Sequence, residues 1–140
     1  MKPENFQAGL SGKHRELPRV QAIRYPYRWE DSGIKRVQQF KDWRHIAMQV
    51  LQRSKGSFRV VAIMDEAFDF ETCECLKTDE EIALEAGNCT VKTIQRDLRA
   101  LRQAGLILSE THWINKGGKK VKGRRVRLAV PSDLTGINVR

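Results

Sequence analysis

The stretch 88–107, NCTVKTIQRDLRALRQAGLI, gathers side chains that can donate hydrogen bonds to anions. At helical spacing Ile94, Leu98 and Leu101 fall on one apolar stripe, and cationic and amide groups cover the rest of the cylinder. Ammonium, guanidinium and amide groups suit phosphates and base edges, and hydroxyl groups at a helix N-terminus suit phosphate. The candidate contact residues in the N-terminal half are Thr90, Lys92, Thr93, Gln95 and Arg96.

A second group of cations follows in residues 106–130. The segments LILSETHWI and RRVRLAV are typical of two strands, and Gly117 and Gly118 in the linking NKGGKKVKG favour a turn. We expect a β-hairpin with a flexible basic loop that neutralises phosphates, which predicts binding that weakens steeply with salt. Its basic residues are Lys116, Lys119, Lys120, Lys122, Arg124, Arg125 and Arg127.

The charge of the chain is polarised along the sequence. The net charge is +9, with 26 Lys and Arg against 17 Asp and Glu. Residues 90–130 hold eleven cations and two acids, Asp97 and Glu110, whereas residues 71–89 hold six acids and one Lys. This distribution favours one face that meets phosphate, although a run of charge is more often a solvated surface.

The elements expected to position these cations are two short helices. TDEEIALEAG has a capping box made by Thr78 and Glu81 and ends at Gly87, and the next helix runs from 91 to 103 or 104, before Gly105. A tight turn between two such helices leaves one side of the second free to enter a major groove.

Two further helices are expected upstream. Residues 31–55 carry an apolar stripe that includes Ile34, Val37 and Phe40, and SFRVVAIMDEAFDF favours a second buried helix, followed by a loop, ETCECLK. The stripe of the first helix must pack on the rest of the chain or on a second copy, so a homodimer through residues 31–54 stays open.

The two ends show no sustained periodicity. Residues 1–30 contain three of the four prolines and predict an extended arm, whose Tyr25, Tyr27 and Trp29 could dock on the domain or lie on nucleic acid. Residues 131–140 predict a tail. The expected organisation is therefore an arm (1–30), a long amphipathic helix (31–55), one domain (56–130) and a tail (131–140).

Several classes of function find no support in the sequence. His14, His45 and His112 lack ligand spacing, and Cys73 and Cys75 are too close for an ordinary zinc site, so no metal or cofactor is expected. No catalytic constellation or phosphate loop is present, and we expect no enzyme. Neither a signal peptide nor an apolar run of about 20 residues appears, which favours a cytoplasmic protein without membrane contact.

The segment TDEEIALEAGNCTVKTIQRDLRALRQAGLI, followed by a basic hairpin, resembles the winged helix-turn-helix family of bacterial DNA-binding domains, especially those of phage and plasmid replication initiators and transcriptional regulators. The resemblance covers about residues 57–130. It implies an α+β, mostly helical fold with a three-helix core and a C-terminal β-hairpin wing, here with an extra long N-terminal helix.

The same resemblance implies the function and the site. Residues 90–102 would read the major groove of double-stranded DNA, with Arg99 joining the five candidates above, and the wing at 116–127 would contact the backbone. The expected role is a nucleoid-associated transcriptional regulator or replication-initiation protein. A non-catalytic protein-interaction module and an RNA-binding protein remain as alternatives.

Overall fold

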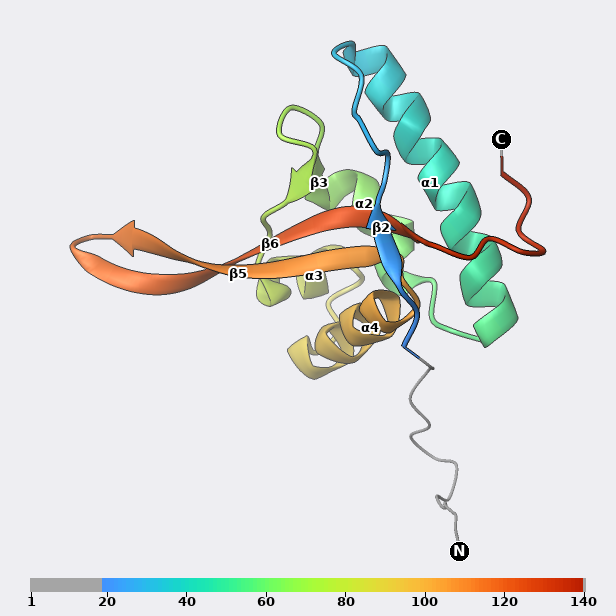
Figure 1. Cartoon of the computed structure of the whole chain (residues 1–140). Helices are drawn as coiled ribbons and strands as arrows, with labels where there is room; N and C mark the ends of the chain where they lie inside the picture. The colour runs from blue at the N-terminus through green and yellow to red at the C-terminus, as the bar shows by residue number, and fades with distance from the viewer. Residues whose placement is uncertain (1–18, 140) are drawn as a thin grey trace, which may run out of the picture.

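The computed structural model describes residues 19–139, apart from the side chains of His112, Ile114, Lys116, Val121 and Lys122. The part of the predicted arm at 1–18 therefore lies outside the described residues. Within them the chain folds as α+β, with four helices and a small antiparallel sheet, which confirms the predicted mixed class (Figure 1). The order is β2 (Ala22–Arg24), α1 (Gly33–Ser54), α2 (Arg59–Ala67), β3 (Phe68–Asp69), β4 (Glu74–Cys75), α3 (Asp79–Glu85), α4 (Val91–Gln103), β5 (Ile107–Lys116) and β6 (Lys119–Pro131).

Helix α1 is attached to the rest of the fold through one apolar face. Its fully buried Trp43 donates a shared hydrogen bond from Nε1 to the carbonyl oxygens of Leu106, at 3.1 Å, and Ala129, at 2.8 Å. These carbonyls lie where the β5–β6 hairpin joins the body, so α1 fixes the base of the hairpin. The buried residues of α1 are Phe40, Trp43, Ile46, Ala47, Val50 and Leu51.

The predicted stripe is wrong at the start of this helix. Ile34 is 85% exposed and Val37 39% exposed, so the apolar contact begins at Phe40. The backbone at Ser32 is extended and α1 starts after it, while Lys55 leaves the helix in the left-handed conformation. The helical pattern alone did not show that the first two turns would extend past the apolar core.

The predicted end of the second helix is wrong, because a short β-hairpin takes the last residues of the predicted helix and part of the predicted loop. Helix α2 ends at Ala67, and β3 and β4 pair Phe68 with Cys75 and Asp69 with Glu74. Cys75 also pairs with Val126 of β6, which joins the small hairpin to the main sheet. Strands of two residues are too short to show an alternating pattern, so no sequence pattern predicts them.

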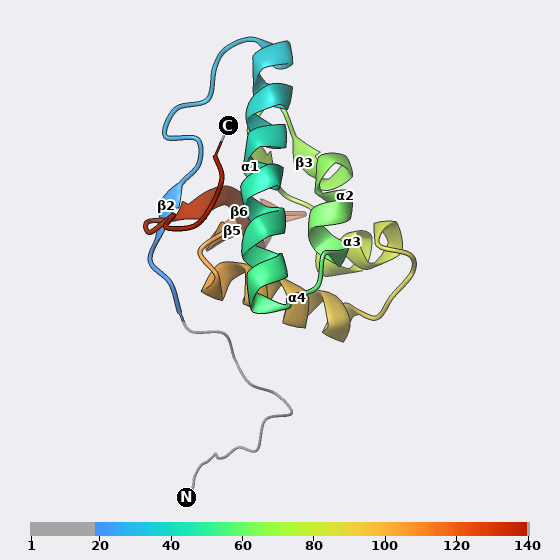
Figure 2. The ribbon, with the colours of Figure 1, turned by 90° about the vertical axis from the view of Figure 1, so that its right-hand side faces the viewer.

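Both ends of the described chain belong to the folded body. Strand β2 pairs with the end of β6, from Ala22 opposite Pro131 to Arg24 opposite Ala129. Figure 2 shows the C-terminal segment beside α1, where Gln49 donates a hydrogen bond to the carbonyl of Asn138 at 2.7 Å. Residues 19–30 and 132–139 therefore extend the fold instead of standing free of it.

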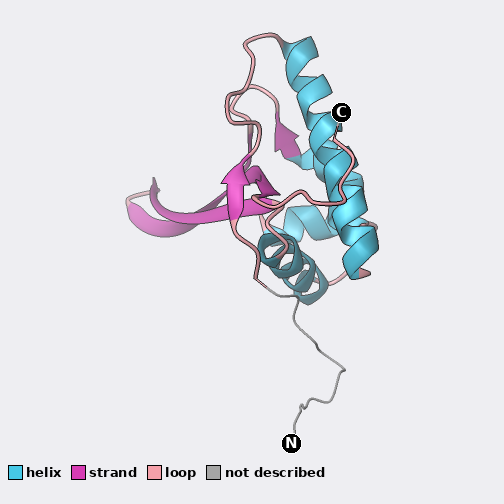
Figure 3. Cartoon of the chain, turned by 45° about the vertical axis from the view of Figure 1, so that its right-hand side comes forward, coloured by secondary structure: helices cyan, strands magenta, loops and turns pink. Residues whose placement is uncertain are grey.

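The β5–β6 hairpin projects from the helices as a long two-stranded ribbon (Figure 3). Its pairing runs from Ile107 opposite Leu128 to Lys116 opposite Lys119. The turn predicted at Gly117 and Gly118 is confirmed, with φ of 59° and 80°. The predicted flexible loop is wrong, because the strands stay paired up to these two residues. Two successive residues with positive φ suit a tight turn that follows the twist of the strands, and glycine adopts them without strain.

Candidate nucleic-acid interface

Local capping determines where α3 and α4 begin. Thr78 and Glu81 form the predicted capping box of α3, and Thr90 Oγ1 accepts a hydrogen bond from the backbone N–H of Thr93 at 3.2 Å. Between the helices Gly87 and Asn88 have positive φ, and the Cys89 N–H donates to the Ala83 carbonyl at 3.1 Å. This turn directs α4 away from α3 and sets which of its faces is exposed.

An ion pair holds α4 against α2. Asp97 is 5% exposed, and its carboxylate accepts a hydrogen bond from Arg59 Nη1 at 2.9 Å, with Arg96 Nε at 3.7 Å. In the sequence Asp97 stands as one acid among many cations, and its burial was not predicted. Its spacing of three from Ile94, on the apolar stripe, was the signal that it faces inward.

The predicted contact residues of α4 divide into capping and exposed groups. The hydroxyls of Thr90 and Thr93 lie 2.9 Å apart and serve the helix N-terminus. Gln95 and Arg96 are exposed, although Arg96 leans toward Asp97. Exposed cations, with no ion pair to any residue that the structure describes, are Lys92, Arg99 and Arg102. Arg102 was absent from the predicted contact set.

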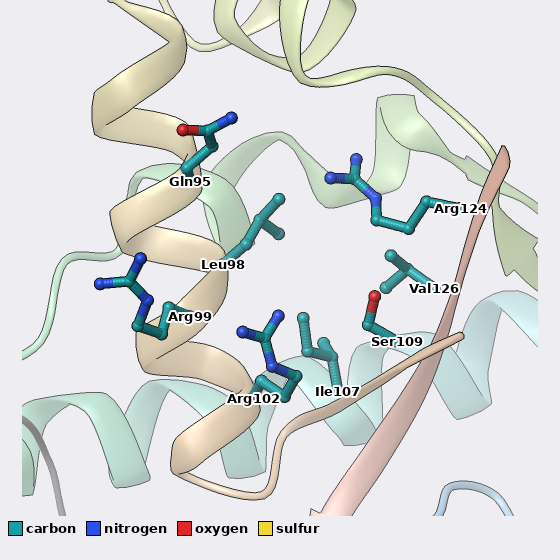
Figure 4. Close-up of a pocket in the computed structure, with 8 residues that line it drawn as sticks. All are labelled: Gln95, Leu98, Arg99, Arg102, Ile107, Ser109, Arg124 and Val126. Carbon is teal, nitrogen blue, oxygen red and sulfur yellow. The ribbon is translucent and has the colours of Figure 1, made fainter. Parts of the chain in front are cut away.

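A pocket of about 240 Å³ opens between α4 and the hairpin (Figure 4). Apolar side chains from three elements, Leu98, Ile107 and Val126, contribute its buried surface. Polar and cationic side chains complete the lining, and they are Gln95, Arg99, Arg102, Ser109 and Arg124. The concave surface between helix and ribbon is thus rich in hydrogen-bond donors.

Asp79, the first residue of α3, links the two sides of this pocket. It forms an ion pair with Arg124 of β6, and it accepts a hydrogen bond from Gln95 Nε2 of α4 at 3.3 Å. Arg124 also donates to the Lys77 carbonyl at 3.0 Å. Charged groups at this depth hold a defined geometry better than exposed ones, so the hairpin is oriented relative to α4.

On the opposite face of the ribbon Glu74 pairs with two arginines. Its Oε2 lies 2.9 Å from Arg127 Nε and 3.3 Å from Arg125 Nε, and Arg127 also reaches Glu110 at 3.3 Å. Arg124 and Arg125, which were predicted to contact the DNA backbone, therefore form ion pairs within the protein.

The tip of the ribbon holds the remaining predicted contacts. Lys119 and Lys120 are exposed, with no ion pair to another residue of the described chain. Lys116 forms the last pair of the same ladder, opposite Lys119, and Lys122 pairs with Trp113; the side chains of Lys116 and Lys122 lie outside the description. The tip thus presents cations on a ribbon of fixed register.

The described residues form no arrangement typical of a metal site or a membrane span. No group of three or more His, Cys, Asp or Glu within it is arranged to hold a metal ion. Burial raises the pKa of the Cys73 and Cys75 thiols, which keeps both protonated at neutral pH. Among the described helices, none is long and apolar enough to cross a membrane.

No protein-family model, curated protein or solved structure matches this chain.

Proposed function

We propose that the chain is a double-stranded DNA-binding protein of the winged helix-turn-helix type. In this proposal α3 and α4 are the helix-turn-helix and the β5–β6 ribbon is the wing. The observation that carries it is the concave surface between α4 and the ribbon, where Arg99 and Arg102 form no ion pair with another described residue. Clustered, uncompensated cations on one concave face favour a polyanion as partner.

Helix α4 would enter the major groove. A B-DNA major groove about 12 Å wide accepts an α-helix. Gln95 and Arg96, in the N-terminal half, carry amide and guanidinium groups that can pair with base edges. Arg99 and Arg102 lie further along, beside the pocket, and would contact phosphates.

The wing would contact the backbone through the cations near its turn. Lys119 and Lys120 are exposed there, whereas Arg124 and Arg125 are engaged with Asp79 and Glu74. We assign phosphate contact to the two lysines and a positioning role to the two arginines. Each neutralised phosphate releases counterions, so the logarithm of the affinity should fall by about 0.9 per contact for each tenfold rise in salt.

The biological role that suits such a surface is a nucleoid-associated transcriptional regulator or replication-initiation protein. Both roles require recognition of particular sites, which base-edge contacts from α4 would provide. A second copy could join through the outer side of α1, where Ile34 and Val37 are exposed. A dimer would bind paired half-sites about one helical turn apart.

Selection from a random-sequence duplex library at two salt concentrations tests this function. Recovery of an enriched motif supports a sequence-specific regulator or initiator, and a palindromic motif supports the dimer as well. Salt-sensitive binding without a motif contradicts base reading by α4. If single-stranded RNA competes better than any duplex, or if nothing binds, the proposal of a duplex-binding protein is wrong.

A further inference from the structure

Trp113 is the most exposed of the three tryptophans. It lies on β5 and is 63% exposed, whereas Trp43 is fully buried and Trp29 packs against the core through Phe68. A single exposed apolar side chain is ordinary on a protein surface. The position of Trp113, and not its exposure alone, is what suggests a role.

The strand register places Trp113 on the side of the ribbon that turns toward α4. Residues directly opposite each other in a hairpin share a face, and so do alternate residues along one strand. Ser109 pairs with Val126 and Thr111 pairs with Arg124. Ser109, Val126 and Arg124 all line the pocket beside α4. Trp113 is the next position of that face toward the turn, opposite Lys122.

The distance along the ribbon suits the spacing of DNA grooves. Trp113 follows Ser109 by four residues, which spans about 13 Å at the usual rise of a strand. Neighbouring major and minor grooves lie half a helical turn apart, about 17 Å. With α4 in a major groove, the Trp113 side chain would therefore come to the edge of the next minor groove.

We infer that Trp113 enters this minor groove and packs its indole against the sugars and base edges. The inference rests on the proposed function. A minor groove about 6 Å wide admits a flat ring placed edgewise, and apolar side chains are what many minor-groove proteins insert there. Lys119 and Lys120, near the turn, would neutralise the phosphates on either side of the ring.

This contact has a salt dependence that separates it from the lysine contacts. Burial of an indole releases no counterions, so loss of the ring should lower affinity by a similar factor at every salt concentration. Loss of a lysine that contacts phosphate should also reduce the slope of affinity against salt. The ring and its neighbouring cations can therefore be tested separately on one ribbon.

The experiment uses the whole chain and a mixed-sequence duplex of about 20 base pairs, two helical turns. Trp113→Thr removes the ring but keeps a residue that favours strands, Trp113→Phe keeps an aromatic ring, and Trp29→Phe is the matched control. Affinity is measured by the anisotropy of a labelled duplex at several salt concentrations. Tryptophan emission is recorded in parallel with an unlabelled duplex.

We expect duplex to quench tryptophan emission in the wild type and in Trp29→Phe, but not in Trp113→Phe. Trp113→Thr should bind roughly fivefold or more weakly with an unchanged salt slope, and Trp113→Phe should lose much less. Circular dichroism of the variants checks that the fold is retained.

Three results would overturn the inference, and they differ from one another. If the duplex binds and quenches tryptophan emission equally in the wild type and in Trp113→Phe, Trp113 does not lie in the interface, and the proposed function still holds. If a single strand quenches the emission and the duplex does not, Trp113 binds unpaired bases and not a minor groove. Absence of duplex binding in every variant contradicts the proposed function itself.

Discussion

At the scale of single residues, two aspartates determine which cations remain available to a partner. Asp97 holds Arg59 beneath α4, and Asp79 holds Arg124 beside the pocket. The exposure of Gln95 and Arg96 on α4 was predictable, because it follows from one local helical pattern. The ion pairs of Arg124 and Arg125 were not, because their partners lie far away in the sequence.

The buried carboxylate leads to a prediction about stability. Asp97→Asn should lower the free energy of unfolding by about 1–3 kcal/mol, because Arg59 loses a charged partner inside the fold. Urea denaturation of the wild type and the variant measures this difference in the free energy of unfolding. The matched control is Arg96→Ala, which removes a 63% exposed partner of the same carboxylate and should cost less than about 1 kcal/mol. Equal losses in both variants would show that the Arg59 pair adds no stability.

Tyr25 leads to a prediction about pH. Burial, together with the charge of Asp42, raises the pKa of Tyr25 from 10.0 to about 12. The folded state then keeps a proton that the unfolded state loses, so this stability is complete below pH 10 and declines as the pH rises toward 12. Tyr25→Phe should lose less stability than the wild type over this range.

Two measurements check the Tyr25 prediction. In a Tyr27→Phe variant Tyr25 is the only tyrosine, and its phenolate absorbance should develop with a midpoint near 12. Urea denaturation of the wild type and of Tyr25→Phe at neutral and alkaline pH gives the change in stability. A midpoint near 10, or parallel losses in both proteins, would show that the phenol is not held in its neutral form.

At the scale of elements, the helices with a clear periodicity or cap were predictable, and the two-residue strands were not. Helices α1, α3 and α4 were predictable because the apolar spacing and the capping residues that indicate them lie within one or two helical turns of each other. Strands β3 and β4 depend on pairing with β6, a contact between distant parts of the chain. The β5–β6 ribbon is paired up to its turn, where a flexible loop was predicted. The turn depends on two glycines, whose conformations the sequence allows but does not dictate.

The turn of the ribbon leads to a prediction about binding. Gly118 has φ of 80° and open space around its Cα, so a side chain is opposed by backbone conformation and not by a clash. Gly118→Val should therefore loosen the tip, increase amide hydrogen exchange there and weaken duplex binding, while the helices stay intact. Gly118→Asn is the control, because asparagine tolerates a left-handed backbone. If both variants bind like the wild type, the register of the tip does not matter for binding.

At the scale of the whole molecule, exposed cations and a concave surface occur on the same side, between α4 and the β5–β6 ribbon. The acids of 71–89 supply Glu74 and Asp79, which pair with cations at the base of the ribbon, while the cations of α4 and of the tip remain exposed. Two of the exposed cations of α4, Arg99 and Arg102, line the concave surface between α4 and the ribbon. Such a surface should draw in a polyanion at low salt and release it at high salt.

The most direct test of this arrangement is the salt-dependent affinity of charge variants for a labelled duplex. Arg99→Ala with Arg102→Ala should weaken binding by at least about tenfold at low salt and lower the salt slope by about 1.8, as for two phosphate contacts. Lys41→Ala removes an exposed cation from α1 and should change affinity by less than about twofold. Equal effects from α4 and α1 would mean that DNA is attracted by net charge alone, and would contradict a binding surface between α4 and the β5–β6 ribbon.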